Sequence, residues 1–138
     1  MLTNSILVVD RDREVGNSIS EFLRDDFDIH IVNNGRDVLD TIRKHEIKLL
    51  LTDIDLPDVY FYQLLNRIKE EFPALPVILM YVYCDCTQEM EDTLRQLADA
   101  IFLKPFDLQE LKKRIEYLLH SRSTNGFPQV RKNQSPGF

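Results

Sequence analysis

Hydrophobic residues form five short, nearly continuous runs along the chain, separated by longer amphipathic segments. Runs of this length without strict polar alternation are typical of strands covered on both faces of a parallel sheet. The strands are expected at residues 5–9, 28–32, 49–52, 76–80 and 100–103. Apolar residues at helical spacing follow each run. The clearest helix begins at Asp107, with Glu110 three residues later as in a capping box, and its apolar stripe is Leu108, Leu111, Ile115 and Leu118.

Strict alternation of strand and helix predicts an α/β fold with a doubly wound, five-stranded parallel sheet, (βα)5 and flavodoxin-like. Residues 1–120 are expected to form this one domain, which is long enough to bury a core. Residues 121–138 are polar, aperiodic and contain Gly, Pro and Asn. That composition predicts a linker or a disordered tail.

Charge and hydropathy narrow the function classes. The formal net charge is −6, and residues 121–138 carry three basic residues and no acid, so residues 1–120 carry −9. A domain this acidic is poorly suited to direct nucleic acid binding and better suited to a cation or a basic protein surface. No apolar run approaches the ~20 residues of a membrane span, and the first residues lack a basic leader. The sequence therefore predicts a cytoplasmic protein with no membrane partner.

Cysteine and histidine give no metal signal. Cys84 and Cys86 form a lone C-x-C and are expected to be free thiols in a loop. His30, His45 and His120 lie far apart in the chain without ligand spacing, which favours structural or surface roles.

Polar residues gather at the predicted strand ends, where open α/β sheets bind ligands. The stretch LLLTDIDLPD (49–58) places Asp53, Asp55 and Asp58 after the third strand. Such acids repel one another unless a cation lies among them or they point apart. Asp10 follows the first strand and Lys104 the fifth.

Two acidic strand ends and a lysine are typical of a magnesium and phosphoryl site. Mg²⁺ prefers hard oxygen ligands, and a carboxylate held beside it can become an aspartyl phosphate. Asp53 is the expected nucleophile because it ends the most apolar strand, and Lys104 is its expected ion-pair partner. Pro105 would hold the chain that carries Lys104, and a cis bond is compatible with this position.

Four motifs in this order resemble the receiver domain of two-component response regulators: ILVVD (6–10), TDIDLP (52–57), PVILM (76–80) and KPF (104–106). The resemblance covers residue 5 to about residue 119. It implies the strand order 2-1-3-4-5. It also implies that Asp53 accepts a phosphoryl group that Lys104 contacts, with Asp10 and the backbone carbonyl of Asp55 helping to hold Mg²⁺.

The same resemblance implies partners. A sensor histidine kinase or a phosphotransfer protein would donate the phosphoryl group, and the domain would at most dephosphorylate itself slowly rather than act as an enzyme. The signal would pass through the face formed by the fourth strand to the fifth helix, to an output domain or a partner protein. A homodimer could form through part of that face, namely the fourth helix, the fifth strand and the fifth helix. Lys112, Lys113 and Arg114 are expected on the solvated side of the last helix, or opposite acids across such a dimer.

The chain departs from the receiver pattern at four positions. Arg11 stands where receivers carry a second acid that binds the metal directly, and a guanidinium cannot coordinate a cation. Tyr81 and Ile101 occupy the switch positions, where a small hydroxyl residue and an aromatic residue are usual. Phe61 replaces a glycine in the loop after the acceptor. We therefore expect an atypical site with a muted switch, and Asp12 as the N-cap of the first helix.

The sequence leaves two possible roles for the Arg11 side chain. Its guanidinium could fork onto Asp53 or Asp10 and substitute for the metal, or it could point to solvent. For Tyr81, packing into the core is favoured over a gating role.

Three other functions compete with a phosphorylated receiver. A divergent receiver could act as a docking module without phosphate. D-x-D at Asp53 and Asp55 also resembles haloacid-dehalogenase-type phosphohydrolases. Those enzymes carry D-x-D after their first strand and need a late acidic pair, where this chain has Lys104. Flavin binding would need a phosphate-cradling loop after the first strand, which the sequence DRDRE does not supply.

Overall fold

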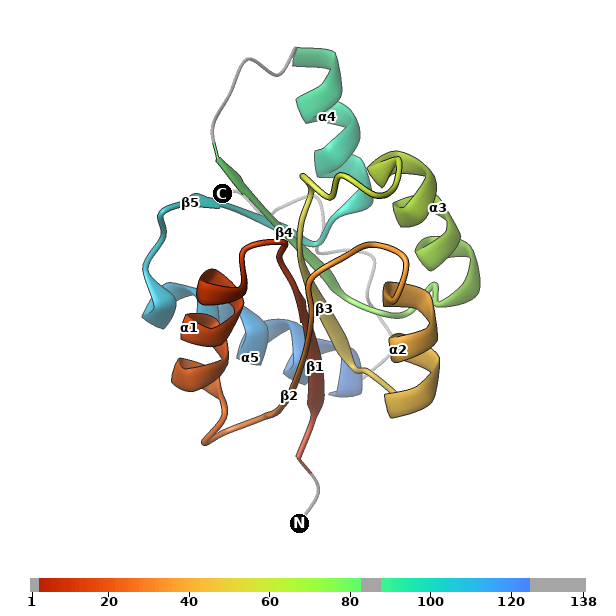
Figure 1. The fold of residues 1–138 in the computed structure, drawn as a ribbon. Helices are drawn as coiled ribbons and strands as arrows, with labels where there is room; N and C mark the ends of the chain where they lie inside the picture. Colours follow the sequence, from red (N-terminus) through yellow and green to blue (C-terminus); the bar gives the residue numbers. More distant parts are fainter. Residues whose placement is uncertain (1–2, 83–87, 125–138) are drawn as a thin grey trace.

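A computed structural model describes residues 3–82 and 88–124. Strands and helices alternate along the chain as the hydrophobic pattern predicts (Figure 1). The elements are β1 (Ser5–Val9), α1 (Arg13–Leu23), β2 (Asp28–Val32), α2 (Val38–His45), β3 (Leu49–Asp53), α3 (Phe61–Glu71), β4 (Val77–Val82), α4 (Gln88–Leu97), β5 (Ala100–Lys104) and α5 (Leu108–Thr124).

The strands form one parallel sheet in the order β2-β1-β3-β4-β5, which confirms the predicted fold class and strand order. The order reverses between β1 and β3, so the loops after these two strands flank a crevice. In the register, Val9 pairs with Thr52 and Asp53 with Met80. The residues that follow β1 and β3 therefore emerge at the same edge of the sheet.

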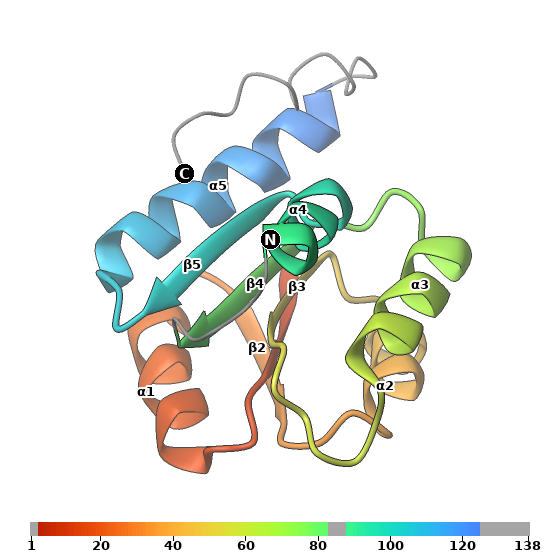
Figure 2. The ribbon, with the colours of Figure 1, turned by 90° about the horizontal axis from the view of Figure 1, so that it is seen from above.

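Helices cover both faces of the sheet. α1 and α5 lie on one face, and α2, α3 and α4 on the other (Figure 2). Alternate residues of each strand enter different cores: Leu7 and Val9 pack with α2 and α3, whereas Ile6 and Val8 pack with α1 and α5. This two-sided burial explains why the strands read as continuous apolar runs.

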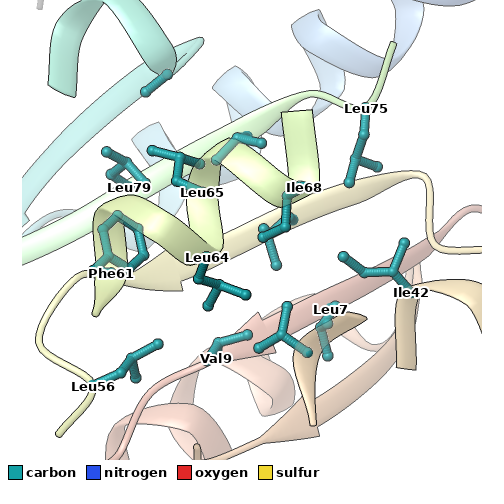
Figure 3. Close-up of a cluster of buried hydrophobic side chains, with 14 of the residues drawn as sticks. Leu7, Val9, Ile42, Leu56, Phe61, Leu64, Leu65, Ile68, Leu75 and Leu79 are labelled. Atoms are coloured by element: carbon teal, nitrogen blue, oxygen red, sulfur yellow. The ribbon is translucent and has the colours of Figure 1, made fainter. Parts of the chain in front are cut away.

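The larger core, here called the α3 core, lies between the sheet and α2, α3 and α4. Leu64, Leu65 and Ile68 of α3 pack in this core with Leu7 and Val9 of β1, and Leu65 lies beside Leu79 of β4 (Figure 3). Burying each of these side chains contributes roughly 1.5–3 kcal/mol. The α3 core thus anchors β1 and β3, whose ends carry the polar residues.

Helix ends follow the capping signals in part. The Asp12 side chain accepts a hydrogen bond from the backbone N–H of Glu14 at 2.9 Å, so Asp12 is the predicted N-cap of α1. Asp107 accepts one from the N–H of Gln109 at 2.8 Å at the start of α5. Helix α5 continues to Thr124, so the domain boundary expected at residue 120 falls inside a helix. Cys84, Cys86 and most of the predicted tail lie outside the described residues.

Across residues 3–82 and 88–124, no helix combines the length and apolar character needed to span a membrane.

Candidate phosphoacceptor site

Two carboxylates and one ammonium group meet at the carboxyl edge of the sheet. Asp10 follows β1, Asp53 ends β3, and Lys104 ends β5. The Lys104 Nζ atom lies 2.7 Å from Oδ2 of Asp10 and 2.6 Å from Oδ2 of Asp53. Asp10 is 1% exposed and Asp53 6% exposed. The ion pair between Asp53 and Lys104 expected from the sequence is therefore present, and the same lysine also neutralises Asp10.

The second oxygen of each carboxylate bonds to the backbone. Oδ1 of Asp10 accepts the N–H of Asp12 at 2.9 Å, and Oδ1 of Asp53 accepts the N–H of Asp55 at 2.8 Å. Both acids are thus held by one neutral and one charged donor. Their orientation is fixed before any ligand arrives.

Lys104 is held in its charged form. Its partial burial would lower its pKa, but hydrogen bonds to Asp10 and Asp53 and the charge of both carboxylates outweigh this effect and leave the pKa raised. The bond between Lys104 and Pro105 is cis. The ammonium group is therefore available as a permanent positive charge beside Asp53.

The three acids of the stretch 49–58 point to three different partners. Asp53 binds Lys104, whereas the Asp55 carboxylate lies 3.6 Å from Nη2 of Arg11. The Arg11 and Asp55 side chains are 55% and 69% exposed. The prediction that Arg11 forks onto Asp53 or Asp10 is wrong for this structure, because the partly buried Lys104 occupies the position between these two acids.

Asp58 connects two loops at the edge of the site. Its two carboxylate oxygens accept the backbone N–H groups of Gly35 at 2.8 Å and Arg36 at 2.9 Å. The Arg36 Nε atom adds an ion pair at 3.4 Å. These contacts, led by the hydrogen bond from Gly35, lower the pKa of Asp58. The loop after β3 is thereby fastened to the loop after β2.

The sequence reasoning missed this role of Asp58. A Cβ atom at Gly35 would lie 2.5 Å from Cγ2 of Val59, so the two loops also approach each other very closely. A glycine in the loop after the second strand is the one sequence signal of this contact. The signal was ambiguous because glycine is common in turns for many reasons.

The two switch positions lie in or against the α3 core. Tyr81 is 3% exposed and belongs to that core, which confirms the packing role favoured from the sequence. Its hydroxyl lies 3.5 Å from a carboxylate oxygen of Glu91 in α4. Ile101 packs against the same core. Phe61, which replaces the usual glycine, is buried there as the first residue of α3.

Tertiary structure also pairs two histidines expected to have separate structural or surface roles, and a lysine, Lys112, expected on the solvated side of the last helix or opposite acids across a dimer. The rings of His30 and His45 stack with centroids 4.1 Å apart, and Nε2 of His30 lies 3.1 Å from Asp28. Lys112 of α5 forms an ion pair with Asp26 at 2.8 Å. These contacts lie on β2, α2, α5 and the connection between α1 and β2, and they brace the fold.

Comparison with known proteins identifies the class. The model of the response regulator receiver domain matches residues 6–116, so the chain belongs to this family of two-component signalling proteins. Members of the family are phosphoacceptors rather than enzymes in the usual sense.

Individual relatives support the assignment to the receiver family. Response regulator Rre1 of Synechocystis is 32% identical over 119 residues, covering 83% of this chain and 51% of the relative. Transcriptional regulatory protein CiaR of Streptococcus pneumoniae is 32% identical over 117 residues, covering 83% and 50%. The chain thus spans about half the length of these two relatives. A CheY-like receiver domain from Methanospirillum hungatei superposes with a TM-score of 0.82 at 26% identity, covering 91% of this chain and 100% of that one.

Receiver domains typically bind Mg²⁺, and the residues of this site can be tested for that ion. Mg²⁺ prefers near-octahedral coordination by oxygen ligands, among them usually one or two carboxylates that carry no competing cation. Here all four side-chain oxygens of Asp10 and Asp53 are bonded to N–H or ammonium donors, and the residue after Asp10 is the cationic Arg11. Within the described part of the chain, no group of three His, Cys, Asp or Glu side chains is arranged to hold a metal ion. As arranged, these residues do not fit a divalent cation.

Proposed function

We propose that this chain is a receiver domain with an atypical site, in which Asp53 accepts a phosphoryl group from a sensor histidine kinase or a phosphotransfer protein. The observation that carries the proposal is the 2.6 Å contact between Lys104 Nζ and Asp53 Oδ2 at the carboxyl edge of the sheet. It places a permanent cation on a fixed, nearly buried carboxylate at the end of a parallel strand.

The chemistry needs only groups that are already in position. A carboxylate oxygen of Asp53 attacks phosphorus, the bond from phosphorus to the donor atom breaks, and the donor leaves with the bonding electrons. Lys104 stays close to the oxygens of the transferred group and offsets their negative charge. Asp10 keeps Lys104 in place through its own contact at 2.7 Å. Hydrolysis of unrelated phosphate esters, as in a haloacid-dehalogenase-like enzyme, is not expected, since the late acidic pair is replaced by Lys104.

The surface formed by β4, α4, β5 and α5 is the proposed contact for an output domain, a partner protein or a second copy. Each of its last three elements carries a large apolar side chain that is well exposed. They are Met90 at 39%, Leu103 at 43% and Tyr117 at 53%. Exposed apolar residues shared by adjacent elements are typical of protein contacts.

A second candidate is a docking module that works without phosphate. The buried position of Tyr81 favours it, since a phenol ring packed in the α3 core cannot place a small hydroxyl on the phosphoryl group. In that case the partner would recognise one fixed shape of the domain.

Intact mass spectrometry after incubation with acetyl phosphate distinguishes the two. A phosphoryl adduct that is absent from Asp53→Ala and retained in Asp40→Asn supports a phosphorylated receiver. The second variant is a control, because it neutralises an exposed acid of α2 outside the site. No adduct, with or without Mg²⁺, under conditions that label an ordinary receiver would favour the docking module.

A further inference from the structure

The position next to Asp10 is cationic, although it lies beside two buried carboxylates. Arg11 leaves the end of β1 and reaches the loop after β3, where its Nη2 atom lies 3.6 Å from the Asp55 carboxylate. Below it, Lys104 links Asp10 and Asp53, which lie at the ends of the same two strands. Two cations therefore lie at the crevice: the partly buried Lys104, and Arg11 at the exposed rim.

Arg11 makes the site less negative than an acid at the same position would. Asp10, Asp53 and Asp55 each carry one negative charge, and Lys104 and Arg11 each carry one positive charge, which leaves a net charge of −1. An acid in place of Arg11 would change its charge from plus one to minus one, a change equal to the charge of one divalent cation. The resting site, with its net charge of −1, consequently attracts such a cation less strongly than a site with an acid at this position.

The partner of Arg11 is weakly bound and close to the acceptor. Both side chains of the ion pair with Asp55 are more than half exposed, and exposed pairs of this kind contribute little to stability. The backbone N–H of Asp55 binds Asp53 directly at 2.8 Å. Arg11 can therefore exchange one exposed carboxylate for a phosphoryl dianion on Asp53, which offers more charge and three acceptor oxygens.

We infer that Arg11 takes the place of the divalent cation in this receiver. The phosphoryl group on Asp53 is bound between Lys104 and Arg11, and its transfer requires no metal ion. With acetyl phosphate, an Asp53 oxygen forms the new bond to phosphorus while the bond from phosphorus to the acetyl oxygen breaks, and acetate leaves with the electron pair. This inference rests on the proposed function of Asp53.

The first test measures metal binding without any reaction. Mn²⁺ binding is followed by electron paramagnetic resonance for the wild type, Arg11→Asp and Arg24→Asp, with Mg²⁺ as competitor. Arg24→Asp is the matched control, because it makes the same charge change at an exposed residue at the far end of α1. We expect saturable binding only in Arg11→Asp. Saturable binding to the wild type that Mg²⁺ displaces would overturn the inference and leave the proposed function intact.

The second test measures labelling by acetyl phosphate in EDTA and in Mg²⁺. The wild type should be labelled equally in both, Arg11→Gln should be labelled at least about 10-fold more slowly in EDTA, and Arg11→Lys should recover part of the rate. Labelling of the wild type only with Mg²⁺, or equal rates for the wild type and Arg11→Gln in EDTA, would contradict the role of Arg11 while upholding Asp53 as acceptor. No labelling of the wild type in either buffer would overturn both proposals. If Arg11→Asp were then labelled with Mg²⁺, Arg11 would be a block and not a substitute.

Discussion

Lys104 holds its ammonium nitrogen 2.6 Å from the carboxylate of Asp53, although 51 positions separate the two residues in the chain. The contact exists because β3 and β5 run parallel on either side of β4 and end at the same edge of the sheet. The contact stabilises the sheet edge and also places a positive charge beside the proposed acceptor, since the same lysine binds both Asp53 and Asp10.

Replacing Lys104 with Met should destabilise the domain by about 3 kcal/mol, because two nearly buried carboxylates would lose their shared cation. Chemical denaturation followed by circular dichroism measures this change. Lys112→Met is the control, since it removes a lysine from a more exposed ion pair with Asp26 and should cost much less. Adding Asp53→Asn to Lys104→Met should restore part of the loss. A double variant no more stable than the single one would contradict the electrostatic explanation.

Replacing Asp58 with Asn should cost roughly 1 kcal/mol at neutral pH, because a charged acceptor of two backbone N–H groups is lost. The pKa of Asp58 is lowered in the folded chain from its ordinary value of 3.8. Its contribution is therefore complete above that value and is lost as the pH falls through the folded pKa. The unfolding free energies of wild type and variant, measured by urea titration between neutral and acidic pH, should converge at the acidic end. A difference that stayed constant with pH would show that the charge of Asp58 does not stabilise the loops.

Gly35→Ala should destabilise the same pair of loops by about 1–2 kcal/mol, because the new methyl group would lie 2.5 Å from Cγ2 of Val59. Val59→Ala in the same chain should recover much of this loss by removing the clash. Gly16→Ala is the comparison, since its methyl group would meet Ile31 at 3.2 Å and it gains helix propensity within α1. Thermal unfolding of the wild type, the two single glycine variants and the double variant measures these differences in stability. Gly35→Ala should have the lowest melting temperature of the four. Equal melting temperatures for Gly35→Ala with and without Val59→Ala would rule out the steric explanation.

Phosphorylation should change the face formed by β4, α4, β5 and α5 only slightly, because Tyr81 is already packed in the α3 core and Ile101 lacks a ring that could move. Hydrogen exchange with mass spectrometry, before and after labelling with acetyl phosphate, measures this response. We expect protection changes mainly in the loops after β1 and β3, which carry Arg11 and Asp55. A large, reversible change across α4 and β5 would show that the switch works in spite of these two residues.

The fold could be predicted from the sequence because strands and helices leave hydrophobic patterns over a few neighbouring residues. A strand buried on two faces needs a continuous apolar run, and a helix on a sheet needs an apolar stripe, so the bounds of β1, β2 and β5 could be read almost to the residue. Asp53 and Lys104 could be assigned to one site since parallel strands end at the same edge.

The partners of side chains in exposed loops could not be predicted from local sequence patterns. Arg11 follows Asp10 directly, and nothing in the sequence says whether its long side chain turns toward Asp53 or out to Asp55. The outcome depends on Lys104, which lies at the end of a strand distant in sequence and occupies the position between Asp10 and Asp53. Asp58 and Gly35 are likewise joined by the geometry of two loops, and His30 and His45 by the packing of α2 against the sheet.

The sequence by itself determined the order of elements, the apolar faces and the residue types at each strand end, because these depend on composition over a few neighbouring positions. Only the tertiary structure decided which cation neutralises which acid. Asp53 and Asp10 share Lys104, Asp55 pairs with Arg11, and Asp58 binds the backbone of a different loop. The physical reason is that electrostatic pairing depends on distances of a few ångströms and on burial, and the packing of the whole sheet sets both.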